Sequence, residues 1–281
     1  MQALHIEQTY RVLLGDVNCF RIMVVGCGGT GSSLALALAG LVYHAWQKGI
    51  QMELTLVDDD VIEARNVGRQ YFAAGSALAS SALAGGIPKA TDLALRLNAA
   101  YGLAIEAWPQ RYTAGMAAAW FRHEMHRPRT AHLLVGCVDN HEGRRELART
   151  VEDYHGRVWA MDCGNEQVSG QVFIGNLSDP RHIRLDPLGL CSGLPSPYVQ
   201  EPALLEPDPD EQRHSCAEQA LAEPQSLMVN RLVAAVAAQY ATTFVLQRQV
   251  VQLGSVFSLE PTVMAAKLIT AASLAPYTEQ E

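Results

Sequence analysis

The residues best suited to chemistry lie close together in the stretch Arg21 to Gln70. An apolar run, Ile22 to Val25, leads into Gly26-Cys27-Gly28-Gly29-Thr30-Gly31 and then into an alanine- and leucine-rich segment. This order predicts a strand, a glycine turn and a helix. Glycines at 26, 28 and 31 leave backbone N–H groups and a helix amino terminus open to an anion, because a side chain there would hold the backbone away. The stretch predicts a phosphate or pyrophosphate site, and the alternative is a tight turn made only for packing.

A carboxylate follows at the end of the second predicted strand. The apolar run Leu54 to Val57 ends on Asp58, which is placed to accept hydrogen bonds from ribose hydroxyls. Dinucleotide-binding enzymes use an acidic residue about 20 positions beyond the glycines, and the gap here is somewhat longer. The alternative for Asp58 is a structural carboxylate in a turn. We interpret the neighbouring Asp59 and Asp60 as solvated or structural.

Three further residues separate a simple nicotinamide site from a site that acts on phosphate. Asn66 and Arg69 follow within a dozen positions, and Lys89 stands beside Pro88 at the start of a predicted helix. Two cations added to a glycine turn indicate that charge develops on phosphate during a reaction, as in phosphoryl or nucleotidyl transfer. Each cation taken alone fits a solvated surface charge equally well.

Strands that alternate with helices have to position these residues. Four apolar runs are each followed by glycine or polar residues: 22–25, 54–57, 132–136 and 158–161. The pattern predicts an α/β fold, a Rossmann-like, doubly wound and mostly parallel sheet with helices on both faces. Ligands of such sheets bind beyond the carboxyl ends of the strands, where Gly26, Asp58 and Asp139 all fall.

Changes in composition divide the chain into four parts. These are an amino-terminal arm or helix over 1–20, a core over 21–175, a proline-rich crossover over 176–215, and a carboxy-terminal helix and strand extension of the same domain over 216–281. In the last part we expect a long helix to about Leu246, strands over Val250 to Leu259, and a terminal helix from Thr262 to about Leu274.

Net charge and cysteine usage exclude several classes of protein. The formal net charge of −8, without a lysine or arginine block, argues against a nucleic-acid partner. No apolar run reaches the roughly 18–20 residues that span a bilayer, and no signal peptide is visible, so we expect a cytoplasmic protein without a membrane partner. The six cysteines include no Cys-x-x-Cys pair and are expected to be reduced thiols. Three of them, Cys27, Cys137 and Cys163, adjoin predicted strand ends and are interpreted as packing residues.

Five separated motifs, taken in order, resemble the ThiF/MoeB/HesA family of ATP-dependent activating enzymes, which are related to the ubiquitin-activating enzymes. Beyond the glycine turn, the motifs are Leu56-x-Asp58-x-Asp60-Val61, Asn66-x-x-Arg69-Gln70, Pro88-Lys89 and Val138-Asp139-Asn140-x-x-x-Arg144. The likeness covers roughly residues 20–175. Within the family, the chain is similar to the ThiF-like proteins of the plasmid-associated PRTRC gene system.

The resemblance implies an ATP site and the residues that form it. Those residues are Gly26, Gly28, Gly29, Gly31, Asp58, Asn66, Arg69, Gln70, Lys89, Asp139 and Asn140. By the family pattern the glycines lie along the phosphates and Asp58 binds the ribose. Arg69, Lys89 and Asp139 would act in catalysis. Asp139 would also hold Mg²⁺ beside the triphosphate, directly or through water.

The implied reaction joins a carboxylate to AMP. The carboxy-terminal carboxylate of a small ubiquitin-like or sulfur-carrier protein would attack the α-phosphate of ATP, giving an acyl-adenylate and pyrophosphate. The resemblance also implies a homodimer, in which Arg11 would cross to the ATP of the other subunit. Two alternatives stay open: an oxidoreductase that uses NAD(P), and a nucleotide-binding scaffold without turnover.

Relatives differ in whether a cysteine takes over the activated acyl group. Cys216 is the candidate thiol here, because it follows the proline-rich crossover, stands close to His214 and lies where a helix would begin. Cys191 is the second candidate, and the alternative is that neither thiol is catalytic. Many relatives bind structural zinc through two Cys-x-x-Cys pairs, which this chain lacks, so we expect no structural zinc.

Overall fold

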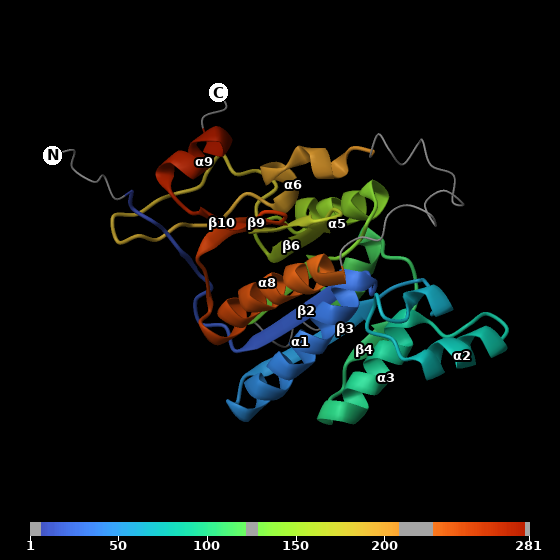
Figure 1. Cartoon of the computed structure of the whole chain (residues 1–281). Helices are drawn as coiled ribbons and strands as arrows, with labels where there is room; N and C mark the ends of the chain where they lie inside the picture. Colours follow the sequence, from blue (N-terminus) through green and yellow to red (C-terminus); the bar gives the residue numbers. More distant parts are fainter. Residues whose placement is uncertain (1–6, 122–128, 208–226, 279–281) are drawn as a thin grey trace.

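A mixed sheet of eight strands organises the fold, in the spatial order β10-β9-β7-β6-β5-β2-β3-β4 (Figure 1). The computed structural model describes residues 7–121, 129–207 and 227–278. Five neighbouring strands are parallel: β4 (Glu106–Trp108), β3 (Gln51–Val57), β2 (Cys19–Val25), β5 (Thr130–Gly136) and β6 (Val158–Asn165). Three antiparallel strands extend them: β7 (Ser169–Gly175), β9 (Gln252–Leu259) and β10 (Thr262–Leu268). The predicted Rossmann-like, mostly parallel sheet is confirmed.

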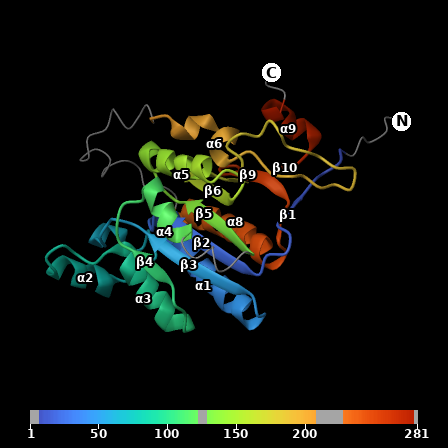
Figure 2. The same ribbon diagram turned by 180° about the vertical axis from the view of Figure 1, so that it is seen from behind.

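Helices cover both faces of this sheet, as Figures 1 and 2 show from opposite sides. One face carries α1 (Gly29–Gln47), α3 (Lys89–Tyr101) and α8 (Leu227–Leu246). The other face carries α4 (Ala117–Phe121), α5 (His141–Asp153) and α6 (Pro197–Gln200). The remaining short elements are η1 (Ala64–Asn66), α2 (Ala74–Ala82), η2 (Ala114–Met116), η4 (Pro202–Leu205) and α9 (Ala271–Thr278).

The central strand β2 shows why the sheet is buried on both sides. Phe20, Ile22 and Val24 point into a core shared with α1 and α8. Met23 and Val25 point the other way, into a second core shared with α4 and α5. Because successive side chains of a strand alternate between faces, a strand covered on both sides reads as one unbroken apolar run.

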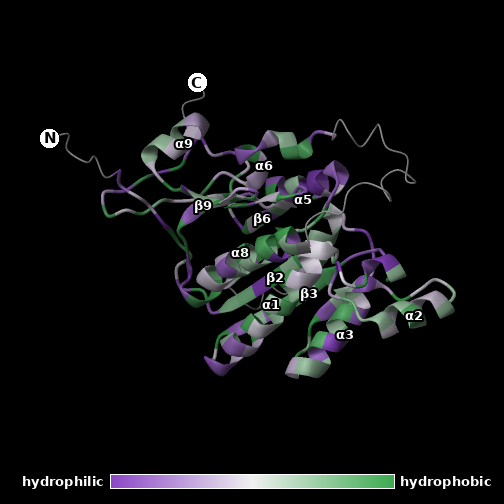
Figure 3. Ribbon diagram, viewed as in Figure 1, coloured by the Kyte–Doolittle hydropathy of each residue, from purple (hydrophilic) through white to green (hydrophobic). Residues whose placement is uncertain are grey.

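Helix α8 packs one side against the sheet and α1. Its segment Met228–Leu246 is long and apolar enough to cross a bilayer by length and composition, so the expectation that no run reaches this length is wrong. The helix lies against α1, β6 and β7, and Val229, Val233 and Phe244 are completely buried. Figure 3 shows apolar residues along α8 and along the strands it covers. Packing on the sheet therefore accounts for the buried apolar residues of the helix.

The carboxy-terminal segment differs from the prediction of one helix over Thr262 to Leu274. Residues Thr262–Leu268 form strand β10, which pairs antiparallel with β9, and the helix that follows, α9, starts only at Ala271. The alanines Ala265 and Ala266 favour a helix locally. Pairing with β9 stabilises the extended conformation instead, which is a case of tertiary context overriding local propensity.

The amino-terminal arm and the crossover segment are extended rather than helical where they are described. Strand β1 (Val12–Leu13) pairs with β8 (Gln249–Val250), and the backbone of Arg11 pairs with the crossover at Leu190. The crossover is irregular from Asn176 to Pro207 apart from α6 and η4. The amino-terminal arm is thus held by backbone pairing with β8 in the carboxy-terminal part of the chain and with the crossover segment.

Candidate functional site

One cavity of about 1710 Å³ opens beyond the carboxyl ends of β2, β3, β5 and β6. Ten residues of the predicted nucleotide site line it: Gly26, Gly28, Gly29, Asp58, Asn66, Arg69, Gln70, Lys89, Asp139 and Asn140. The eleventh, Gly31, is buried in the first turn of α1 behind the cavity wall. The fold thus brings together residues from motifs that are widely separated in the sequence.

Two glycines of the loop lie in close contact with neighbouring backbone, whereas a third has open space beside it. Gly26 has a φ of +91°, and a Cβ on it would lie 2.6 Å from the carbonyl oxygen of Cys137. A Cβ on Gly31 would lie 1.8 Å from the carbonyl oxygen of Gly26. Packing therefore explains these two glycines, but a Cβ on Gly28 would meet nothing within 4 Å. Gly28 precedes α1 without a side-chain cap, so the first N–H groups of the helix face the cavity.

Asp58 fixes the glycine loop to the end of β3. Its Oδ2 accepts a hydrogen bond from the Cys27 N–H at 2.5 Å, and its Oδ1 accepts one from the Asp60 N–H at 2.8 Å. Burial raises the pKa of Asp58, and the two N–H donors and Lys89 oppose that rise. The carboxylate therefore has the structural role left open from the sequence, and it still lines the cavity.

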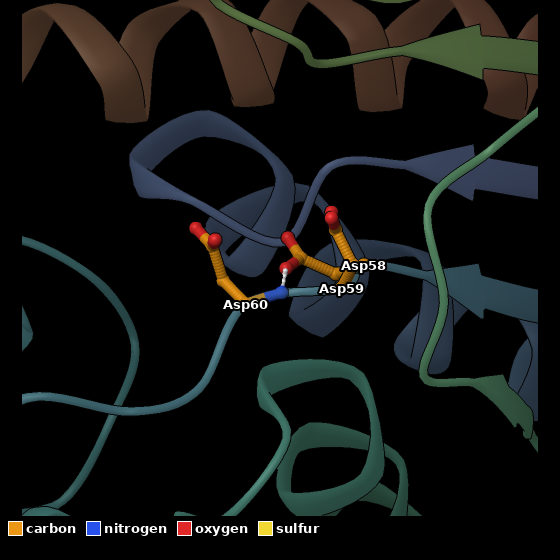
Figure 4. Close-up of side chains that lie close together, drawn as sticks. All are labelled: Asp58, Asp59 and Asp60. Atoms are coloured by element: carbon orange, nitrogen blue, oxygen red, sulfur yellow. Dashed lines mark hydrogen bonds between the residues drawn. The ribbon is translucent and has the colours of Figure 1, made fainter. Parts of the chain in front are cut away.

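Asp58, Asp59 and Asp60 bring their carboxylates within 4.8 Å of one another (Figure 4). Two of the three are already engaged within the chain. Asp58 accepts from backbone N–H groups, and Asp60 pairs with the Lys89 ammonium, whose Nζ lies 2.7 Å from Oδ2. Of the two readings of Asp60, solvated or structural, the structural one holds, because its carboxylate neutralises a buried cation.

The segment after β3 presents two cations to the cavity: Arg65, whose Nε lies 2.5 Å from Glu63 Oε2, and Arg69. Asn66 is buried, and its Oδ1 accepts a hydrogen bond from the Glu63 N–H at 2.8 Å, which closes the turn η1. Within the described ranges, the Arg69 guanidinium is exposed and pairs with no carboxylate. Gln70 has a buried Oε1 that finds no hydrogen-bond donor among the described residues. Arg69 is thus available to an anion in the cavity.

The turn between β5 and α5 places Asp139 on the cavity wall. Asn140 caps α5, since its Oδ1 accepts a hydrogen bond from the Gly143 N–H at 2.8 Å. The Asn140 amide also donates to Asp139 Oδ1 at 3.2 Å, and the Asp139 side chain is exposed. A single carboxylate beside a phosphate site is the donor set that Mg²⁺ commonly uses, so Asp139 fits the metal role implied by the resemblance.

A buried ion pair behind the cavity was not predicted. Asp162, which lies within β6 opposite Gly136 at the end of β5, is 1% exposed, and its Oδ2 lies 3.4 Å from the Nε of Arg144. Burial raises the pKa of Asp162 to about 6, and Arg144 opposes the rise. The available signal in the sequence was that Asp162 directly follows the apolar run 158–161.

A second unpredicted group ties α8 to the nucleotide loop. The Oδ1 of Asn230 accepts hydrogen bonds from Thr30 Oγ1 at 3.0 Å and from Asn165 Nδ2 at 2.8 Å. A Cβ on Gly29 would lie 2.5 Å from the Asn230 amide nitrogen. No local pattern predicts this contact, because Thr30 and Asn230 are 200 positions apart.

The cysteines contribute little to the cavity where they are described. Cys191 is buried, its thiol donates to the Gly193 carbonyl oxygen at 3.0 Å, and burial raises its pKa. It is not among the residues that line the cavity, so the geometry does not support it as the acyl-accepting thiol. Cys27 and Cys163 are buried, as expected of packing residues, whereas Cys137 is half-buried on the cavity wall. Cys216 and the neighbouring His214 lie outside the described residues.

The fold and the glycine loop define a Rossmann-like α/β protein with a cavity at the carboxyl ends of its parallel strands. The chain belongs to the ThiF family, whose family model matches residues 13–276. A comparison with curated proteins gave no match.

Solved structures share the fold at low sequence identity. PaaA aligns with a TM-score of 0.54 and 16% identity, over 90% of this chain and 65% of the PaaA chain. Escherichia coli MccB solved with MccA aligns with a TM-score of 0.55 and 11% identity, over 95% and 68% of the two chains. MccB solved with AMPCPP and MccA gives 0.53 and 14%, over 89% and 64%. The chain therefore spans about two thirds of the length of these proteins.

Proposed function

We propose that this chain binds ATP in the cavity and adenylates the carboxy-terminal carboxylate of a small ubiquitin-like or sulfur-carrier protein. The observation that carries the proposal is the convergence of the glycine loop, Arg69, Lys89 and Asp139 on one cavity. Membership of the ThiF family supports it. The AMPCPP and MccA bound to MccB are consistent with a nucleotide and a second molecule in a cavity of this fold.

The side chains suit a reaction in which charge shifts onto pyrophosphate. The carboxylate oxygen of the carrier attacks the α-phosphorus, the bond to the bridging oxygen breaks, and pyrophosphate leaves with the electron pair. The N–H groups at the start of α1 would bind phosphate oxygens, and Arg69 and Lys89 would neutralise the charge that develops. A Mg²⁺ ion held by Asp139 would supply further charge neutralisation when bound. No protein nucleophile is needed for this step.

The alternatives explain fewer of these contacts. An oxidoreductase that uses NAD(P) needs the glycine loop and Asp58, but it gives no reason for Arg69 and Lys89 to face the same cavity as Asp139. A scaffold that had lost turnover would be expected to have lost at least one of Arg69, Lys89 and Asp139, but all three line the cavity. A homodimer is part of the proposal because Arg11, which does not line the cavity of its own subunit, would have to act across an interface.

ATP–pyrophosphate exchange tests the proposal. The chain would be mixed with ATP, labelled pyrophosphate and a panel of small ubiquitin-like and sulfur-carrier proteins. Each carrier would be supplied with a free carboxy terminus and, as the matched control, with an amidated one. Exchange that depends on the free carboxylate is the expected result. Tight ATP binding without exchange by any carrier would favour the scaffold, and binding of NAD in preference to ATP would contradict the proposal.

A further inference from the structure

The ion pair between Asp60 and Lys89 joins residues of very different exposure. The Lys89 side chain is 8% exposed, whereas the Asp60 side chain is 67% exposed. The Lys89 N–H also donates to the Asp60 carbonyl oxygen at 2.9 Å. Lys89 is the first residue of α3, so both contacts hold the start of that helix against the loop after β3. The pair therefore fixes where the ammonium group points.

Asp60 is itself held by the glycine loop. Its N–H donates to Asp58 Oδ1 (Figure 4). Asp58 Oδ2 in turn accepts from the Cys27 N–H. A continuous series of contacts runs from the glycine loop through Asp58 and Asp60 to the Lys89 ammonium. It sets the distance between the backbone N–H groups of the loop and the buried cation.

Burial of the ammonium makes this partner necessary. A charged group removed from water is costly unless an opposite charge and good hydrogen bonds compensate it. Asp59, the neighbour of Asp60, is exposed and makes no hydrogen bond or ion pair with the described residues. The two adjacent aspartates carry equal charge, so only their contacts with Lys89 distinguish them.

We infer that Asp60 is a positioning residue: its carboxylate holds the Lys89 ammonium in the orientation in which it binds a phosphate of ATP. The inference rests on the proposed ATP site. It contradicts a simple electrostatic expectation, because removal of a negative charge near an anionic ligand should by itself strengthen binding. A positioning role predicts weaker binding instead.

Calorimetric titration with ATP and with adenosine tests the inference. Asp60→Ala should weaken ATP binding by about tenfold, as expected for loss of one charge-assisted contact, and should leave adenosine binding unchanged because adenosine carries no phosphate. Asp60→Asn keeps an acceptor oxygen without the charge and should fall between Asp60→Ala and wild type. Asp59→Ala, the matched control, should lose no affinity for either ligand.

A double-mutant cycle separates positioning from a general structural role. If Asp60 acts only through Lys89, Asp60→Ala should have no further effect on ATP binding in a Lys89→Ala background. Additive losses, or unchanged or tighter ATP binding by Asp60→Ala, would overturn the inference. The melting temperature of each variant shows whether a loss of ATP binding comes from unfolding. If Asp60→Ala does not fold, Asp60→Asn is compared with wild type in its place. Failure of the wild-type chain to bind ATP would instead contradict the proposed function.

Discussion

Replacing His132 by phenylalanine should remove a loss of stability at acid pH. The ring lies in β5, fully buried, with its centroid 5.0 Å from that of Trp120 and 4.4 Å from that of Phe121. Burial, aided by the guanidinium groups of Arg21 and Arg157, lowers the pKa of His132 from 6.5 to about 3. The unfolded chain therefore takes up this proton first. Stability that is fully present above pH 6.5 is lost as the pH falls toward 3.

The size of the effect follows from the uptake of one proton on unfolding, which changes the free energy of unfolding by about 1.4 kcal/mol for each pH unit. As the pH falls from about 6.5 to about 4, His132 should lower the free energy of unfolding of the wild-type chain by about 3 kcal/mol. Asp162 acts in the opposite direction. Its pKa is raised from 3.8 to about 6, so its contribution is fully present below pH 3.8 and is lost as the pH rises to 6. Between about pH 4 and pH 6, the two residues therefore change the free energy of unfolding with pH in opposite directions. In His132→Phe, only the contribution of Asp162 should remain.

Urea unfolding of wild type and His132→Phe at about pH 4, 5, 6 and 7 measures the free energy of unfolding. The difference between the two proteins isolates the histidine, because every other titrating group is shared. That difference should move in favour of the variant by about 3 kcal/mol between pH 7 and pH 4. Parallel curves would show that His132 takes up no proton on unfolding, and they would refute the argument from burial.

Three further predictions concern the cavity and its chemistry. Gly28→Ala should keep the melting temperature of wild type within about a degree and weaken ATP binding, whereas Gly31→Ala, whose Cβ would lie 1.8 Å from a backbone oxygen, should destabilise the fold by more than about 1 kcal/mol. Calorimetry with an ATP titration separates the two, and equal losses of stability would contradict this reading of the loop. Asp139→Ala should lose ATP–pyrophosphate exchange while part of the ATP binding survives, since the glycine loop remains; unchanged exchange would remove Asp139 from the site. Cys216→Ala should abolish any thiol-sensitive adduct with the carrier, seen by mass spectrometry, and spare exchange; an adduct that persists would place the acyl-accepting thiol elsewhere.

The parts of the site that the sequence predicts are those with a local signal. Gly26 and Gly28 stand between a strand and a helix, and Asp58 ends the next strand, so their placement follows from the order of elements. Lys89 could be placed because it follows a proline that opens a helix. Each of these residues lines the cavity.

The parts that could not be predicted depend on pairing between distant segments. The carboxylate of Asp60 meets Lys89 across 29 positions, and Asn230 reaches Thr30 across 200. Strand β10 shows the same limit at the level of fold, because its alanines favour a helix until β9 lies beside them. Neither composition nor spacing records which segments become neighbours.

Because Asn230 contacts the glycine loop, the proposed nucleotide site depends on a segment far along the chain from its motifs. Every predicted phosphate-binding residue lies before position 140, but the loop that carries the glycines is held in part by a helix that begins at Leu227. A ribosome that has synthesised the first 175 residues has made all of these motifs without the hydrogen bond that fixes their first turn. The site would therefore be completed late in synthesis, when the last long helix docks, and a fragment that ends before α8 would carry the sequence signature without the complete pocket.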